Sequence, residues 1–84
     1  MAQVTLDNIS YTKINTNPTE YLAQNHSHDV VRIIVTDTDV QPADADTPDF
    51  LLERHDAISD KVAVGYVWGK MTDRAIGYMG LKEG

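Results

Sequence analysis

The sequence Lys61-Val-Ala-Val-Gly-Tyr-Val-Trp-Gly-Lys70, followed by Ala75-Ile-Gly-Tyr-Met-Gly-Leu81, decides the fold class of this chain. Apolar and small residues alternate with period two in both arms, which is typical of β-strands that bury one face. We expect the face of the first arm that carries Val62, Val64, Tyr66 and Trp68 to lie in the core. A short break over 71–74 separates the arms, so the sequence predicts a β-hairpin.

The rest of the chain continues with short strand patterns. Residues 30–36 give the clearest one, because Val30, Val31, Ile33, Ile34 and Val35 are β-branched. Further strands are expected over 4–15 (broken near 7–8), 19–24, 50–52 and 57–59, with turns at 15–19 and 25–29. Two helical alternatives stay open, over 18–24 and over 47–58, since each begins with a capping residue and a proline.

These patterns predict an all-β fold: a small antiparallel β-sandwich or jelly-roll-like domain with short strands and a long acidic loop. The chain has 84 residues, so we expect a single domain over 1–84. It has no cysteine, which excludes disulfides and thiolate metal sites. A small β domain without such cross-links often gains stability from other subunits, and we therefore expect a homo-oligomer.

Charge narrows the expected partners. The chain carries 13 acidic and seven basic residues, for a formal charge of −6, and shows no basic cluster in sequence. Nucleic acid and anionic membranes are therefore not expected partners. The first residues lack a basic and apolar leader, and no segment is apolar over the length of a membrane span, so we expect a soluble chain without an export signal.

The loop over 37–49 is long for so small a domain and rich in aspartate. Long loops in compact domains tend to be functional. Calcium prefers six to eight oxygen ligands from flexible loops, so Asp37, Asp39, Asp44 and Asp46 are candidate calcium ligands. The EF-hand pattern is not met, and we favour a solvated loop that aids solubility; no metal or other cofactor is expected.

The histidines offer a weaker case for chemistry. His26 and His28 stand two residues apart and could reach one zinc or nickel ion, but no third ligand is evident. His55 lies near Asp56 and Ser59, yet neither a nucleophile held against a base nor an oxyanion pocket is visible in the sequence. We expect no enzyme; a small metal-dependent enzyme that uses the three histidines is the alternative.

The aromatic and glycine-rich carboxy-terminal half suggests contacts with other chains. We expect Trp68 and Tyr21 in the core, and Gly65, Gly69, Gly77 and Gly80 to allow close packing between subunits. Interface candidates are Val4, Leu6, Tyr66, Met71, Tyr78 and Met79. A carbohydrate-binding module that uses Tyr66, Trp68 or Tyr78 as a stacking platform is a further alternative.

Several short motifs follow one another in a recognisable order. They are Tyr-Leu-Ala-Gln-Asn at 21–25, the strand at 30–36, a Pro/Ala/Asp loop at 42–49, Phe-Leu-Leu at 50–52 and Val-Trp-Gly-Lys at 67–70 before a last strand. Over about residues 20–84 this order resembles small β-sandwich structural proteins of tailed bacteriophages. Residues 1–19 lie outside the likeness and are expected to form an amino-terminal arm that reaches a neighbouring subunit.

The resemblance implies a virion protein without catalytic residues. We expect a capsid decoration (cement) protein that binds and stabilises a larger shell as a homotrimer; a tail fibre or baseplate module is the alternative. Its partners would be a capsid or tail protein, and its location the virion, after assembly from the host cytoplasm.

Overall fold

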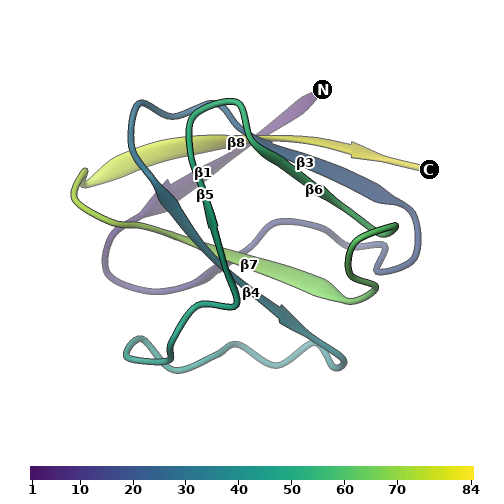
Figure 1. Cartoon of the computed structure of the whole chain (residues 1–84). Helices are drawn as coiled ribbons and strands as arrows, with labels where there is room; N and C mark the ends of the chain where they lie inside the picture. Colours follow the sequence, from purple (N-terminus) through teal and green to yellow (C-terminus); the bar gives the residue numbers. More distant parts are fainter.

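The computed structural model describes all 84 residues and contains eight β-strands and no helix (Figure 1). The strands are β1 (Ala2–Asp7), β2 (Thr12–Lys13), β3 (Tyr21–Asn25), β4 (Val31–Thr36), β5 (Phe50–Leu52), β6 (Ala57–Ser59), β7 (Tyr66–Met71) and β8 (Ile76–Glu83). The predicted strands at 50–52 and 57–59 are confirmed to the residue, and both helical alternatives are wrong.

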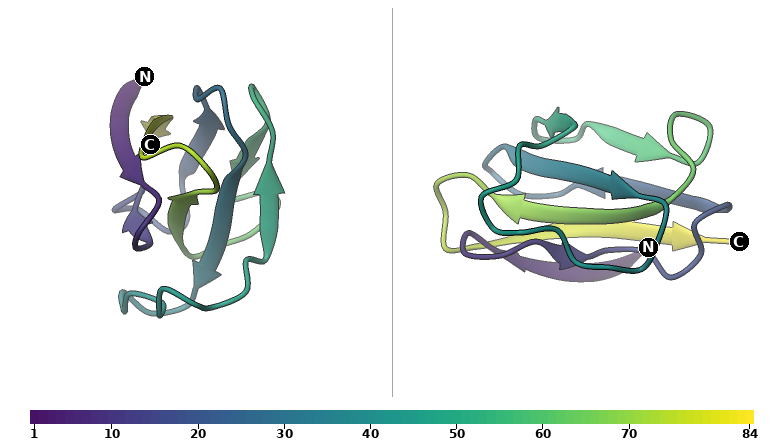
Figure 2. Two further views of the ribbon diagram at one scale, coloured as in Figure 1. Left: turned by 90° about the vertical axis from the view of Figure 1, so that its left-hand side faces the viewer. Right: turned by 90° about the horizontal axis from the view of Figure 1, so that it is seen from below.

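The strands form two antiparallel sheets that pack face to face (Figure 2). Sheet 1 has the order β1-β8-β3-β6, and sheet 2 the order β2-β7-β4-β5. Strand pairs β1/β8, β2/β7, β3/β6 and β4/β5 therefore lie side by side, as in an eight-stranded jelly roll. The predicted antiparallel β-sandwich is confirmed, with a jelly-roll strand order.

The predicted carboxy-terminal hairpin is wrong. β7 pairs with β2 and β4 in sheet 2, whereas β8 pairs with β1 and β3 in sheet 1. Residues 72–75 cross from one sheet to the other, and Asp29 holds this crossing. Its Oδ2 accepts hydrogen bonds from the N–H groups of Asp73 and Arg74 at 2.8 and 3.0 Å. The alternation identified both strands, but period two does not specify which strands pair.

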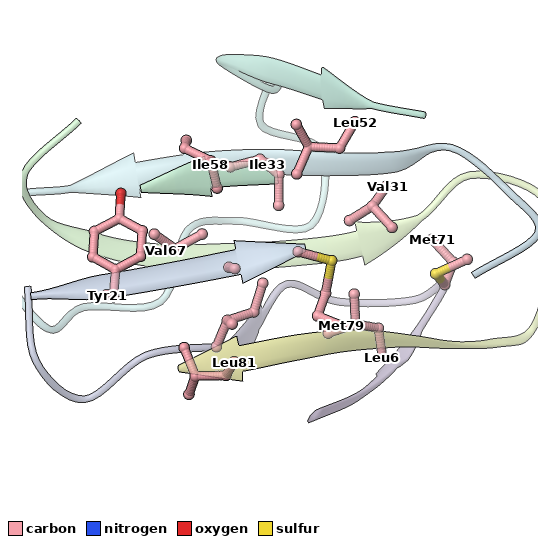
Figure 3. Close-up of a cluster of buried hydrophobic side chains, with 12 residues drawn as sticks. Leu6, Tyr21, Val31, Ile33, Leu52, Ile58, Val67, Met71, Met79 and Leu81 are labelled. Atoms are coloured by element: carbon pink, nitrogen blue, oxygen red, sulfur yellow. The ribbon is translucent and has the colours of Figure 1, made fainter. Parts of the chain in front are cut away.

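The main hydrophobic core lies between the sheets (Figure 3). It contains Leu6, Ile14, Tyr21, Ala23, Val31, Ile33, Leu52, Ile58, Val67, Met71, Met79 and Leu81. Along β7 the core side chains are those of Val67 and Met71, on the face opposite to the one that the sequence predicted. Tyr21 and Trp68 are buried as expected.

Val62 and Val64, predicted for the core, are 65% and 60% exposed. The reason is the break at Gly65, where β7 has not yet begun. Its φ is +151°, and a Cβ there would lie 2.7 Å from the carbonyl oxygen of Thr36. Only glycine fits this conformation and this close approach without strain. The two valines therefore belong to the β6–β7 connection and not to the strand.

The amino-terminal segment is part of the sandwich and not a separate arm. β1 pairs along its whole length with β8, and β2 pairs with β7. Leu6 and Ile14 are buried in the main core. Residues 1–19 therefore supply one edge strand to each sheet, and removal of this segment would open the core.

Candidate protein-binding surface

The outer face of sheet 2 is covered by the chain's own loop over 37–49. A second hydrophobic cluster of Tyr11, Ile34 and Trp68 lies on this face, with Tyr66 packed against it. In Figure 1 the loop runs below β4 and β7, on the side away from β8. The acidic loop itself therefore covers this face of sheet 2.

Polar contacts hold this loop on the sheet. The Lys70 ammonium donates to the main-chain carbonyl of Asp44 and lies 5.0 Å from the centre of the Tyr11 ring. The Tyr11 hydroxyl donates to the carbonyl of Asp46 at 2.9 Å, and the side-chain amide of Gln41 donates to the carbonyl of Tyr11 at 2.7 Å. Burial raises the pKa of the Tyr11 hydroxyl, which keeps it protonated as a donor.

The aspartates of the loop do not form a calcium cage. Asp39 makes an ion pair with Lys13 at 2.8 Å, and Asp46 accepts a hydrogen bond from the N–H of Ala43. No group of three or more His, Asp or Glu side chains in the structure is arranged to hold a metal ion. Asp37, Asp39, Asp44 and Asp46 are thus not brought together as ligands.

The histidines do not converge on one site either. The Nε2 of His26 lies 3.0 Å from Gln24 Oε1, and Gln24 Nε2 donates to the carbonyl of His55. His55 has a left-handed backbone, with φ of 73°, in the β5–β6 connection. His28 is exposed in the turn that follows β3. His26, Gln24 and the main-chain carbonyl of His55 therefore form a polar cluster at the surface, and only one imidazole ring takes part in it.

On the outer face of sheet 1 the ring of His26 lies over Gly80, and several apolar side chains remain exposed. Along β8, Met79 and Leu81 point into the core, so Tyr78 and Lys82 point outward. Leu22 lies directly opposite Lys82 on β3 and also points outward. Exposed fractions are 40% for Tyr78, 39% for Leu22 and 58% for Ile76 at the start of β8. We call these four residues, Leu22, Ile76, Tyr78 and Lys82, the sheet 1 outer surface.

Only one of the six predicted interface residues lies on that surface. Leu6, Met71 and Met79 are buried in the main core, with exposed fractions of 1%, 1% and 0%, so they do not reach another chain. Val4 packs partly against the same core, and Tyr66 packs against the second cluster. Tyr78 is the exposed one. Strand alternation alone could not separate inner from outer residues, because both faces carry apolar side chains.

The predicted aromatic platform is not assembled. Trp68 is 6% exposed and lies with Tyr66 on the outer side of sheet 2, whereas Tyr78 lies on the outer side of sheet 1. The Trp68 indole N–H donates to the Thr36 hydroxyl at 2.9 Å. A sugar ring cannot stack on a tryptophan that its own chain buries.

The glycines also pack against the chain's own side chains. A Cβ on Gly69 would lie 2.9 Å from the end of the Ile14 side chain, and one on Gly77 would overlap Met71 and Ser27. A Cβ on Gly80 would overlap the ring of His26, which lies over it. The glycines therefore allow close packing within the domain.

The protein shows no pocket, and no helix in it has the length and apolar character needed to span a membrane. No protein-family model, no curated protein and no solved structure matches the chain.

Proposed function

We propose that this protein is a non-enzymatic structural subunit, a capsid decoration protein, that docks on a larger protein shell through the sheet 1 outer surface. The observation that carries the proposal is the difference between the two faces of the sandwich. One face is covered by the loop over 37–49, and the other exposes Leu22, Ile76 and Tyr78. Aromatic residues that stay partly exposed beside apolar ones are enriched at protein interfaces.

The fold and the resemblance support the same function. Jelly rolls occur in viral capsid domains, among other proteins, and the sequence motifs over 20–84 resemble structural proteins of tailed phages. Fold alone does not establish function, so the proposal depends on the exposed surface. A tail fibre or baseplate module would use this surface in the same way and differs only in the partner.

A sedimentation assay with particles tests the proposal. Tailed-phage particles that carry this protein would first be stripped of it. The stripped particles would then be mixed with the purified protein and separated on a density gradient. We expect the wild type to migrate with the particles, and Leu22→Ser/Tyr78→Ser to remain at the top. Leu51→Ser is the matched control, because Leu51 is 61% exposed on β5 of the other sheet.

A wild-type protein that stays at the top of the gradient would contradict the proposal. Equal loss of binding in Leu51→Ser would also contradict it, since the effect would not then be specific to sheet 1. Binding to isolated tails and not to capsids would favour the tail module.

A further inference from the structure

One of the four edge strands is long and unprotected. The edges are β1 and β6 in sheet 1 and β2 and β5 in sheet 2. β2, β5 and β6 have two or three residues, whereas β1 has six. Natural proteins protect edges with short strands, proline, lysine or bulges. β1 has neither proline nor lysine, and its register with β8 runs unbroken from Ala2 to Asp7.

The hydrogen bonds of Tyr78 show which main-chain groups of β1 are unpaired. The Tyr78 carbonyl accepts from the N–H of His26 at 3.1 Å, and its N–H donates to the Ser27 hydroxyl at 2.6 Å. Both groups therefore point toward the β3 side, away from β1. Thr5 lies directly opposite Tyr78. In an antiparallel pair, the main-chain N–H and C=O groups of two opposite residues either both point toward the other strand or both point away from it.

The N–H and C=O groups of Thr5 thus point to the free edge. Those of Gln3 do the same, because the pattern repeats every second residue. The side chains of both residues point to the outer side of sheet 1, since Leu6 lies in the core and alternate residues share a face. A second extended strand can satisfy this row of alternating donors and acceptors with its own main-chain groups.

We propose that β1 pairs with β1 of a second copy, antiparallel and across a two-fold axis. Sheet 1 of one copy and sheet 1 of the other then form one continuous eight-stranded sheet. Residues 2–6 carry no charged side chain, so no like charges meet across the axis. Opposite residues must share a face if the two cores are to remain on the same side. In the register centred on Val4, Gln3 faces Thr5 of the second copy, and Val4 faces Val4.

This register also matches the unpaired groups. Gln3 and Thr5 both direct their main-chain groups to the free edge, so each Gln3/Thr5 pair exchanges two hydrogen bonds. A two-fold interface uses the same patch on both subunits, so β1 needs no other complementary surface. The inference changes the expected copy number from three to two. It does not depend on the proposed docking, since the edge pairing leaves the sheet 1 outer surface exposed.

Cysteine cross-linking tests the register, because the natural chain has no cysteine. The full chain would be prepared as Gln3→Cys and as Thr5→Cys, and each variant would be oxidised alone and in an equal mixture. Position 3 lies opposite position 5 in the proposed register, within disulfide range, whereas two residues at position 3 are too far apart. We expect the mixed disulfide to dominate in the mixture, and little cross-linking in either variant alone.

Analytical ultracentrifugation tests the pairing itself. We expect the wild type to sediment as a dimer at high micromolar concentration. Thr5→Pro should sediment as a monomer with an unchanged circular dichroism spectrum, because the lost N–H points away from β8 and proline is tolerated on edge strands. A monomeric or trimeric wild type would overturn the proposal. Equal amounts of same-variant and mixed cross-links would also overturn the proposal. The cross-linking result remains informative even if Thr5→Pro does not fold.

Discussion

The side-chain amide of Asn25 in β3 donates a hydrogen bond of 2.9 Å to the main-chain carbonyl of Leu52 in β5, and so joins the two sheets across the core. Asn25 is fully buried, and all its side-chain polar atoms are used. Its Nδ2 also donates to the carbonyl of Asp29, and its Oδ1 accepts from the N–H of Ser27 at 2.7 Å. One side chain thus fixes the β3–β4 connection and the edge of sheet 2.

We expect Asn25→Ala to lower the free energy of unfolding by about 2 to 4 kcal/mol, because the buried Ser27 N–H, the Leu52 carbonyl and the partly buried Asp29 carbonyl all lose this partner. Urea denaturation followed by tryptophan fluorescence measures the change. The neighbouring substitution Gln24→Ala removes only two exposed hydrogen bonds, to His55 and His26, and should lower the free energy of unfolding by about 0.5 kcal/mol or less. Equal effects of the two variants would contradict the assigned role of Asn25.

Two glycines of β8 should respond differently to alanine. A Cβ on Gly77 would lie 2.2 Å from the Met71 sulfur and 2.6 Å from the Ser27 hydroxyl, both inside the domain. Gly77→Ala should therefore destabilise by about 1 to 3 kcal/mol through overpacking. A Cβ on Gly80 meets the exposed ring of His26, which can turn toward solvent at the loss of one exposed hydrogen bond to Gln24, so Gly80→Ala should destabilise the protein much less. Thermal unfolding of both variants distinguishes these outcomes; equal losses would mean that the two positions are equally enclosed.

Stability should fall at acid pH because of Asp29. The N–H of Asp73, together with those of Arg74 and Val30, holds the pKa of this carboxyl below its usual value of 3.8. A lowered folded-state pKa adds stability above the unfolded-state pKa, and this stability is lost as the pH falls through the folded-state pKa.

The substitution Asp29→Asn isolates this contribution. The difference in free energy of unfolding between wild type and variant should be constant near neutral pH and shrink below about pH 4. Urea titrations at several pH values measure it. A difference that stays unchanged down to pH 2 would show that the charge of Asp29 does not stabilise the 72–75 crossing.

The loop over 37–49 should loosen without global unfolding when its anchors are removed. Lys70→Met removes the bond to Asp44, and Tyr11→Phe removes the bond to Asp46. One lost hydrogen bond of about 1 kcal/mol corresponds to about fivefold faster amide exchange. Hydrogen exchange should show this change at the N–H groups of Asp46 and Asp49, with β3 and β8 unaffected.

Lys82→Met is the matched control for the loop, because Lys82 lies on the opposite face of the sandwich. It should leave exchange in 37–49 unchanged. Faster exchange throughout Lys70→Met would mean that the loop and the sandwich unfold as one unit.

The strands were largely predictable from the sequence, whereas their pairing was not. β-Branched residues indicated the strand predicted over 30–36 and observed at 31–36, and apolar residues after the acidic loop indicated those at 50–52 and 57–59; both signals depend on the local chain. The partners of β7 and β8 depend on the path of 72–75, which is held by Asp29, more than 40 residues away in sequence. A contact at that separation leaves no local pattern.

The candidate surface was predictable only in part for a related reason. Tyr78 stood out as an aromatic residue in a glycine-rich strand, but Leu22 and Ile76 gave no separate signal. Whether an apolar strand residue points to the core or to solvent depends on register and on what covers the other face. The acidic loop covers one face through Lys70 and Tyr11, and this cover is visible only in three dimensions.

The density-gradient assay with phage particles tests the central claim most directly. If the protein is a decoration subunit, the wild type migrates with capsids, Leu22→Ser/Tyr78→Ser does not, and Leu51→Ser behaves as the wild type. A wild-type protein that never leaves the top of the gradient would contradict the account.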